Sequence, residues 1–213
     1  MLVKICGIKD AAALEAARQG GADMVGFVFF PPSPRAVTAN QAGELARSYP
    51  NGPKRVGLFV DPDDAMLAAI LAEVPLDILQ LHGEETPARA GEIRARFGKP
   101  VMKALGIGSK ADLVRLADYA DQVDYFLLDA RPPAGSALPG GNAQAFDWAL
   151  MKNEKPPRPW LLAGGLTPAN VAAAIAASGA PGVDVSSGVE RARGVKDPAA
   201  IAAFIAAAKA RRA

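Results

Sequence analysis

Eight short apolar segments recur along this chain, spaced about every 25 residues, and they constrain its fold more than any other feature. Alanine-rich stretches with helical spacing separate them, which is the alternation expected of repeated βα units on a parallel sheet. The predicted strands are Val3–Cys6, Met24–Phe29, Arg55–Val60, Ile78–His82, Val101–Leu105, Tyr125–Asp129, Trp160–Ala163 and Val183–Ser186.

The segments between these strands carry start and stop signals typical of helices. A Ser, Thr or Asp caps the free N–H groups of a helix, and Pro fits its first position without loss of a hydrogen bond. Predicted starts are Thr38, Asp61-Pro62, Thr86-Pro87, Ser109, Thr167-Pro168 and Asp197-Pro198, and predicted ends are Gly20-Gly21, Gly98 and Gly179.

Eight strands with about eight helices leave little of the 213 residues for anything else. We therefore predict an α/β fold, a single (β/α)8 TIM barrel domain over residues 1–213. No Gly-x-Gly-x-x-Gly follows the first strand, which disfavours an open dinucleotide-binding sheet.

Composition excludes several classes of function. The formal net charge is +2 and the basic residues are scattered, so we expect no nucleic-acid partner. No apolar run is long enough to span a bilayer and the first residues lack a signal-peptide layout, so we expect no membrane partner and a cytoplasmic protein. One cysteine and one histidine allow neither an internal disulfide nor a Cys/His zinc cluster, and we predict no metal.

Polar residues at the ends of the predicted strands are the candidate functional groups, because catalytic residues of such barrels lie at the C-terminal ends of strands. Alternation along the first strand places Lys4 and Cys6 on the inner face, with Val3 and Ile5 toward the helices. A lone cysteine is most often a small buried apolar residue. A buried lysine beside it would favour the thiolate and a functional role.

Strands four, six and eight add further candidates. Asp129 ends the sixth strand, where it is either a turn cap or a buried carboxylate, and His82 follows the fourth, where it is either a hydrogen-bonding residue or a catalyst. Asp184 and Ser186 face inward on the eighth strand. Because that strand neighbours the first in a closed barrel, Asp184 is expected to pair with Lys4.

Small residues after the last two strands predict a phosphate site. Gly164-Gly165 and Ser186-Ser187 occupy the loops that bind phosphate in this fold, where backbone N–H groups can approach an anion. On the proline-stiffened loop after the second strand, Arg35 suits a substrate carboxylate, although the segment by itself also fits a solvated turn.

Taken together, these residues resemble the phosphoribosylanthranilate isomerase family of tryptophan biosynthesis, in order along essentially the whole chain. The matching segments are Val3-Lys4-Ile5-Cys6-Gly7-Ile8, Gly21-Ala22-Asp23, Gly26-Phe27, Ser33-Pro34-Arg35, Val56-Gly57-Leu58-Phe59-Val60, Leu79-Gln80-Leu81-His82-Gly83, Leu128-Asp129, Gly140-Gly141, Phe146-Asp147-Trp148, Leu162-Ala163-Gly164-Gly165-Leu166 and Val183-Asp184-Val185-Ser186-Ser187-Gly188-Val189-Glu190.

The resemblance implies an aldose-ketose isomerase that acts without a cofactor on a small phosphoribosyl substrate by an Amadori rearrangement. It implies Cys6 as the base and Asp129 as the acid. As base, Cys6 should have a pKa lowered or matched by Lys4, and burial should raise that of Asp129. The implied substrate-binding residues are Arg35 for the anthranilate carboxylate, His82 and Asp184 for orientation, and Gly141, Gly164, Gly165, Ser186 and Ser187 for phosphate.

The segment after the sixth strand departs from the family pattern. Ala143 stands where the family often has glycine, and Arg131 to Pro139 is expected to form a flap over the substrate. Two alternatives stay open: a histidine-pathway aminoaldose isomerase, which expects Asp in place of Cys6, and a non-catalytic phosphate-binding subunit. A monomer and a homodimer are equally compatible with the sequence.

Overall fold

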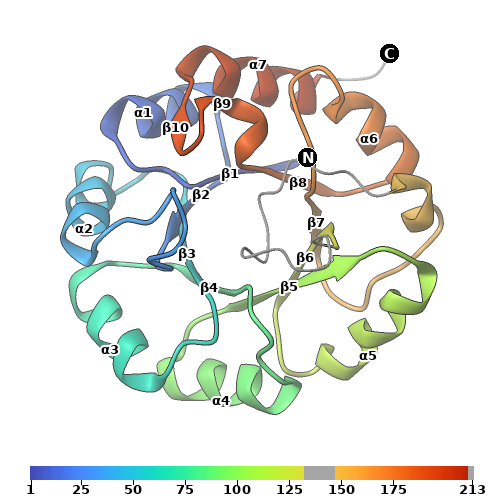
Figure 1. Ribbon diagram of the computed structural model, residues 1–213, viewed down its shortest axis with the longest axis horizontal. Helices are drawn as coiled ribbons and strands as arrows, with labels where there is room; N and C mark the ends of the chain where they lie inside the picture. Colours follow the sequence, from blue (N-terminus) through green and yellow to red (C-terminus); the bar gives the residue numbers. More distant parts are fainter. Residues whose placement is uncertain (132–146, 211–213) are drawn as a thin grey trace.

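The predicted strands are hydrogen-bonded to one another in sequence order, and the last closes against the first (Figure 1). The computed structural model describes residues 1–131 and 147–210. All eight barrel strands are parallel, so the predicted (β/α)8 TIM barrel is confirmed. They are β1 (Leu2–Cys6), β2 (Met24–Val28), β3 (Lys54–Phe59), β4 (Ile78–Leu81), β5 (Val101–Ile107), β6 (Tyr125–Ala130), β7 (Trp160–Leu162) and β8 (Gly182–Val185).

Helices surround the barrel on the outside (Figure 1). The α-helices are α1 (Ala11–Gly20), α2 (Ala39–Ser48), α3 (Asp64–Glu73), α4 (Pro87–Phe97), α5 (Arg115–Tyr119), α6 (Val171–Ser178) and α7 (Pro198–Lys209). Short 3-10 turns are η1 (Lys110–Val114), η2 (Trp148–Met151) and η3 (Ser187–Val189), and a hairpin of β9 (Glu190–Ala192) and β10 (Val195–Lys196) follows β8. None of the helices among the described residues is long and apolar enough to cross a membrane.

Most helix boundaries agree with the sequence signals. Thr38, Thr86 and Asp197 are N-caps whose side chains accept backbone hydrogen bonds. Glycines 21, 98 and 179 are left-handed C-caps. Two predicted starts are wrong: α3 is capped by Asp63 and α6 by Asn170, because the prolines at 62 and 168 lie in the preceding loops.

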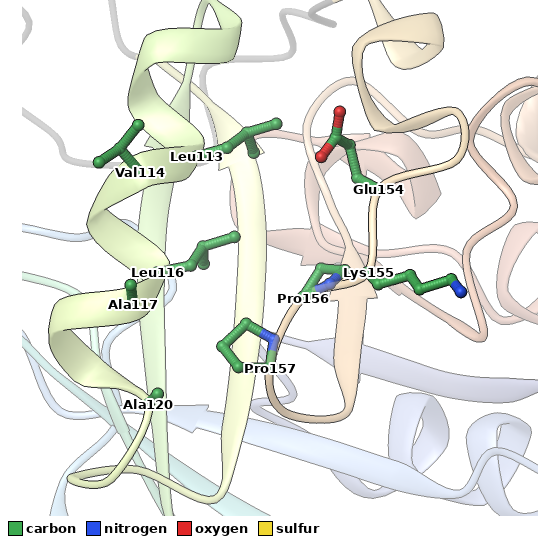
Figure 2. Close-up of a pocket in the computed structure, with 9 residues that line it drawn as sticks. All are labelled: Leu113, Val114, Leu116, Ala117, Ala120, Glu154, Lys155, Pro156 and Pro157. Carbon is green, nitrogen blue, oxygen red and sulfur yellow. The ribbon is translucent and has the colours of Figure 1, made fainter.

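One apolar hollow lies on the outer surface, away from the strand-end residues. It lies between η1 and α5 on one side and the segment that leads into β7 on the other (Figure 2). The residues that line it are Leu113, Val114, Leu116, Ala117, Ala120, Glu154, Lys155, Pro156 and Pro157. None of them is a candidate for catalysis or substrate binding.

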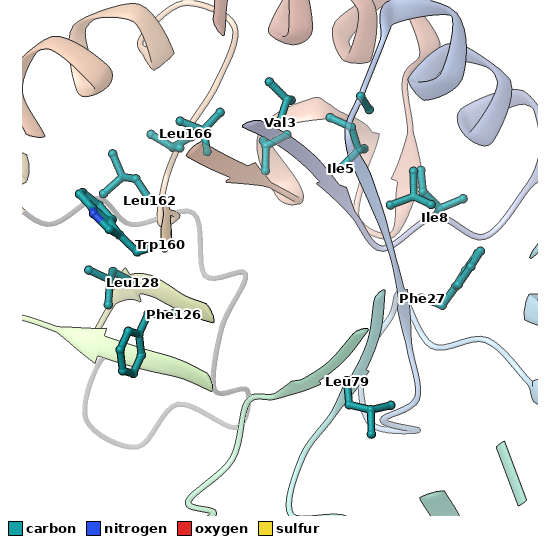
Figure 3. Packing of buried hydrophobic residues seen from close by; sticks show 14 of the residues in the cluster. Val3, Ile5, Ile8, Phe27, Leu79, Phe126, Leu128, Trp160, Leu162 and Leu166 are labelled. Carbon is teal, nitrogen blue, oxygen red and sulfur yellow. The ribbon is translucent and has the colours of Figure 1, made fainter. Parts of the chain in front are cut away.

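The side chains of β1 alternate as predicted. Val3 and Ile5 belong to the large core between the strands and the helices (Figure 3). Lys4 and Cys6 lie on the opposite face, inside the barrel, and both are buried. The barrel interior is thus filled by side chains and is not a pore. Polar groups inside it must find partners there, which brings the candidate residues together.

Aspartates just before three strands secure the other end of the barrel. Asp23, Asp77 and Asp124 precede β2, β4 and β6, and each accepts a hydrogen bond from a backbone N–H near the start of the preceding strand. These charge-assisted hydrogen bonds give partners to backbone N–H groups at the starts of the strands. The carboxyl groups at this end are therefore structural, in contrast to those at the opposite end.

Candidate active site

The thiol of Cys6 lies at the C-terminal end of β1, with 4% of the residue exposed. Its register partner on β2 is Gly26, and a Cβ on that glycine would lie 2.9 Å from the sulfur and 3.4 Å from Lys4 Nζ. A side chain at position 26 would therefore displace both groups. The glycine creates the space in which the thiol and the ammonium sit together.

Lys4 forms the predicted pair with Asp184. Its Nζ lies 2.7 Å from Asp184 Oδ1, and the two residues are register partners on β1 and β8. Burial works to lower the pKa of Lys4, but Asp184 and Cys6 outweigh it and the pKa is raised. Lys4 therefore stays charged inside the barrel, with Asp184 as its partner.

The pKa of Cys6 departs from the expectation. Burial raises it, and this effect exceeds the opposing influence of Lys4 and Lys196, while Asp184 adds to the rise. The prediction that Lys4 lowers or matches the pKa of Cys6 is wrong in its net direction. Lys4 does lower the pKa of the thiol, but burial has the larger effect and Asp184, the partner of Lys4, offsets part of the lowering.

Asp129 lies at the mouth of the barrel, near the end of β6, with its side chain 13% exposed. Burial raises its pKa from an ordinary 3.8 to about 7, and the negative charge of Asp184 acts in the same direction. Its Oδ1 accepts a hydrogen bond of 2.8 Å from the N–H of Ala130, which fixes the carboxyl group. The expected rise is confirmed, and such a carboxyl carries a proton in about half of the molecules at neutral pH.

Replacing this carboxyl tests the shift through stability. The folded protein binds the Asp129 proton more tightly than the unfolded chain does, so wild-type stability falls as pH rises from about 4 to about 7. Asp129→Asn is expected to be more stable than wild type at pH 8, by up to about 4 kcal/mol, and to show no such gain at pH 4. Denaturant unfolding at both pH values measures this, with the exposed Asp121→Asn as control. An equal difference at both pH values would contradict the raised pKa.

His82 follows β4 and joins the same surface. Gln80 Nε2 and His82 Nδ1 are 3.0 Å apart, as expected for side chains on one face. Burial lowers the pKa of His82 to about 3, and Lys103 acts in the same direction, so the ring is neutral. Its Nε2 lies 3.7 Å from Asp129 Oδ2, which is neither an ion pair nor a hydrogen bond. A neutral ring here suits orientation of a substrate.

Gly164 and Gly165, after β7, both have left-handed backbone, with φ of 86° and 62°. A Cβ on Gly164 would lie 2.6 Å from Ala130 N and 2.9 Å from Asp129 Oδ1. Any other residue would be strained and would push against the acid. The N–H groups of both glycines donate to none of the described residues, which leaves them available to an anion.

Ser186 and Ser187 come directly after β8. The surroundings of the Ser186 side chain differ from those expected for a phosphate contact. Ser186 Oγ donates to the Cys6 carbonyl oxygen at 3.2 Å and lies 3.3 Å from Lys196 Nζ. Its hydroxyl therefore already has protein partners. Ser187 begins η3, and its hydroxyl has no hydrogen-bond partner among the described residues.

Arg35 is buried, so the alternative of a solvated turn is wrong. Its Nε and Nη2 bind the two carboxylate oxygens of Glu190 at 2.7 and 3.0 Å. Lys196 Nζ contacts the same carboxylate at 3.0 Å. Glu190 and Lys196 were not predicted from the sequence as site residues. Glu190 lies in a family segment, but the sequence carries no signal that Lys196, just before the cap of α7, is buried.

Three predictions lie outside the described residues: Gly141 as a phosphate contact, Ala143 as a departure from the family, and the flap from Arg131 to Pro139 beyond its first residue. The other candidates line one end of the barrel. Cys6 and Asp184 come from the seam between β1 and β8, Asp129 comes from β6, and His82 follows β4. An acid, a buried thiol, a cation and backbone N–H groups without partners among the described residues thus share one site.

Comparisons with known proteins agree with this arrangement. Residues 3–207 match the family model described as N-(5'phosphoribosyl)anthranilate (PRA) isomerase. An N-(5'-phosphoribosyl)anthranilate isomerase from Paracoccus denitrificans is 60% identical over 208 residues, covering 98% of this chain and 97% of that protein.

Solved structures give the same result. The crystal structure of phosphoribosyl anthranilate isomerase from Thermotoga maritima has a TM-score of 0.88 and 36% identity, covering 98% of each chain. A phosphoribosyl anthranilate isomerase in complex with reduced 1-(o-carboxyphenylamino)-1-deoxyribulose 5-phosphate has a TM-score of 0.85 and 35% identity, also over 98% of each chain. The resemblance is confirmed, and the chain belongs to the N-(5'-phosphoribosyl)anthranilate isomerase family.

Proposed function

We propose that this enzyme converts N-(5-phosphoribosyl)anthranilate to 1-(o-carboxyphenylamino)-1-deoxyribulose 5-phosphate, with Asp129 as the acid and Cys6 as the base. The observation that carries the proposal is the raised pKa of Asp129, about 7, at the mouth of the barrel and beside the N–H groups of Gly164 and Gly165, which donate to none of the described residues. A family member with a reduced form of this product bound supports the choice of substrate.

Asp129 starts the reaction by donating its proton to the furanose ring oxygen. The bond between that oxygen and C1 breaks, and the nitrogen lone pair forms a protonated imine with C1. A carboxyl group with a pKa near the working pH is suited to this step, because it holds the proton and still releases it readily. Ala130 N–H keeps the carboxyl in place while the ring opens.

Cys6 completes the reaction as a thiolate. It takes the proton from C2, and the electron pair of that C–H bond moves to give an enolamine, which tautomerises to the ketone. Because burial raises the pKa of Cys6, the thiolate is a minor form near neutral pH. Positive charge close to the sulfur is therefore important for the rate.

The remaining residues hold the two ends of the substrate. Arg35 faces the anthranilate carboxylate, since Glu190 occupies only Nε and Nη2 and leaves Nη1 without a partner among the described residues. Gly164, Gly165 and Ser187 bind phosphate, together with Gly141 and the Ser186 backbone. His82 and Asp184 orient the sugar.

Arg35→Ala is expected to raise KM by about 10- to 100-fold, because a hydrogen-bonded charge is worth about 1.5–3 kcal/mol. Loss of substrate fluorescence during turnover gives both constants. Arg55→Ala is the matched control, since Arg55 makes a similar two-point contact with Asp77 at the other end of the barrel, at 2.8 and 3.1 Å. If wild type used a substrate without the carboxylate equally well, Arg35 would have another role.

The proposal also covers the cellular compartment and the oligomeric state of the enzyme. We place the enzyme in the cytoplasm, where its unpaired Cys6 would stay reduced. The assembly is a monomer or a homodimer, and a dimeric relative is known from Thermotoga maritima.

A further inference from the structure

A buried cluster of three charged side chains lies beside Cys6. Glu190 Oε1 contacts Arg35 Nε at 2.7 Å and Lys196 Nζ at 3.0 Å, while its Oε2 contacts Arg35 Nη2 and the N–H of Gly194, both at 3.0 Å. The side chains of Arg35, Glu190 and Lys196 are 7%, 5% and 1% exposed. One carboxylate is thus shared by two cations, and with Lys196 protonated the cluster carries one net positive charge.

Hydrogen bonds connect Lys196 directly to the end of β8 and through it to Cys6. Its Nζ donates to the Ser186 carbonyl oxygen at 2.8 Å and lies 3.3 Å from Ser186 Oγ. That hydroxyl donates to the Cys6 carbonyl at 3.2 Å. The ammonium is therefore held two hydrogen bonds from the main chain of Cys6, in a place shielded from solvent.

The charged side chains near the thiol can be named for its own strand and for the two strands beside it. Lys4 lies on the same strand and Asp184 on β8, and the two form an ion pair at 2.7 Å, so Asp184 offsets part of the effect of Lys4 on the thiol. On the other side, β2 contributes Gly26, which has no charge. Beyond this pair, the further positive charge that acts on Cys6 is that of Lys196, which is held in the cluster with Glu190 and Arg35.

We propose that Lys196 is a positioning residue whose ammonium favours the thiolate form of Cys6. The proposal rests on the proposed function for its use in catalysis, because it explains how a buried thiol can serve as the base. A cation held near a thiol stabilises the thiolate, most strongly where water is excluded. The opposing effect of Lys196 on the raised pKa of Cys6 agrees with this role.

Removal of the Lys196 charge and removal of the Glu190 charge are expected to shift the Cys6 pKa in opposite directions. Removing the Lys196 charge leaves Arg35 and Glu190 as a neutral pair, so the thiolate loses support. Removing the Glu190 charge leaves two cations, so the thiolate gains support. A purely structural role for these residues would not produce opposite shifts of one thiol.

Cys6 is the single cysteine of the chain, so its alkylation can be followed without substrate. The rate of modification by iodoacetamide, measured by mass spectrometry across pH, has its midpoint at the pKa of the thiol. Lys196→Met is expected to raise that midpoint by about one pH unit, Lys196→Arg to keep it near wild type, and Glu190→Gln to lower it. Lys103→Met is the matched control, because Lys103 is equally buried and pairs with Glu85, but does not face Cys6.

An unchanged midpoint in Lys196→Met, or a shift equal to that of Lys103→Met, would overturn the proposal. Should Lys196→Met fail to fold, Glu190→Gln decides: a lowered midpoint supports the proposal, and an unchanged or raised one refutes it. Turnover is measured separately. If the midpoints shift as expected while Cys6→Ala keeps full activity, the inference about the thiol stands and the assignment of the base fails.

Discussion

The Asp129→Asn enzyme is expected to lose about 10²- to 10⁴-fold in kcat, the usual contribution of a positioned acid. Asparagine keeps the oxygen that accepts the Ala130 N–H and nearly the same volume, so the backbone near Gly164 need not move. What it lacks is a proton that can be given to the ring oxygen. The loss should fall on kcat more than on KM, because the proton moves only in the transition state.

Asp124→Asn provides the control for this variant. Asp124 is also an aspartate at a strand of the barrel, but it accepts the N–H of Val101 at the opposite end. Its turnover should match wild type within about twofold, as expected for a site that does not contact substrate. Asp129→Asn turnover within about tenfold of wild type would show that the acid is another group.

Cys6→Ala is the second variant with a large expected effect, again about 10²-fold or more in kcat. The substitution removes only the sulfur atom, and Lys4, which has a hydrogen bond to the thiol, keeps its ion pair with Asp184. Folding should therefore survive, which a thermal melt checks. The same continuous fluorescence assay measures the loss, and Cys6→Ser should be impaired as well, since a hydroxyl is a far weaker acid than a thiol.

The reaction needs a protonated Asp129 and a Cys6 thiolate in the same molecule, and only a minority of molecules hold both at neutral pH. Asp129 must hold a proton although its pKa is about 7, and Cys6 must lose one although burial raises its pKa. Wild-type turnover therefore depends on how far the surroundings favour the thiolate. This makes the charges around β8 as important for the rate as the two reacting groups themselves.

The barrel and its strand-end residues could be predicted because each depends on a local pattern. Alternation placed Lys4 and Cys6 inside, and neighbouring first and last strands implied the pair with Asp184. The net direction of the Cys6 pKa could not be predicted, since it depends on how much burial outweighs nearby charge.

Contacts between residues far apart in the chain could not be predicted from the sequence either. Arg35 lies on a loop after β2, and its partner Glu190 is 155 residues away in the chain. No periodicity connects the two. Lys196 was missed for a similar reason, because its burial depends on how the β9–β10 hairpin folds over the end of β8.

The seam between β1 and β8 joins the two ends of the chain, and it also carries much of the site. Lys4 meets Asp184, and the Cys6 carbonyl meets Ser186, each across 180 residues. Because the first strand is synthesised before these partners, its lysine has no native ion-pair partner until the C-terminal segment emerges. A nascent chain lacking that segment has neither a closed barrel nor a paired Lys4, and Cys6, although made with the first strand, gains the neighbouring charge of Asp184 only when the last strand is added.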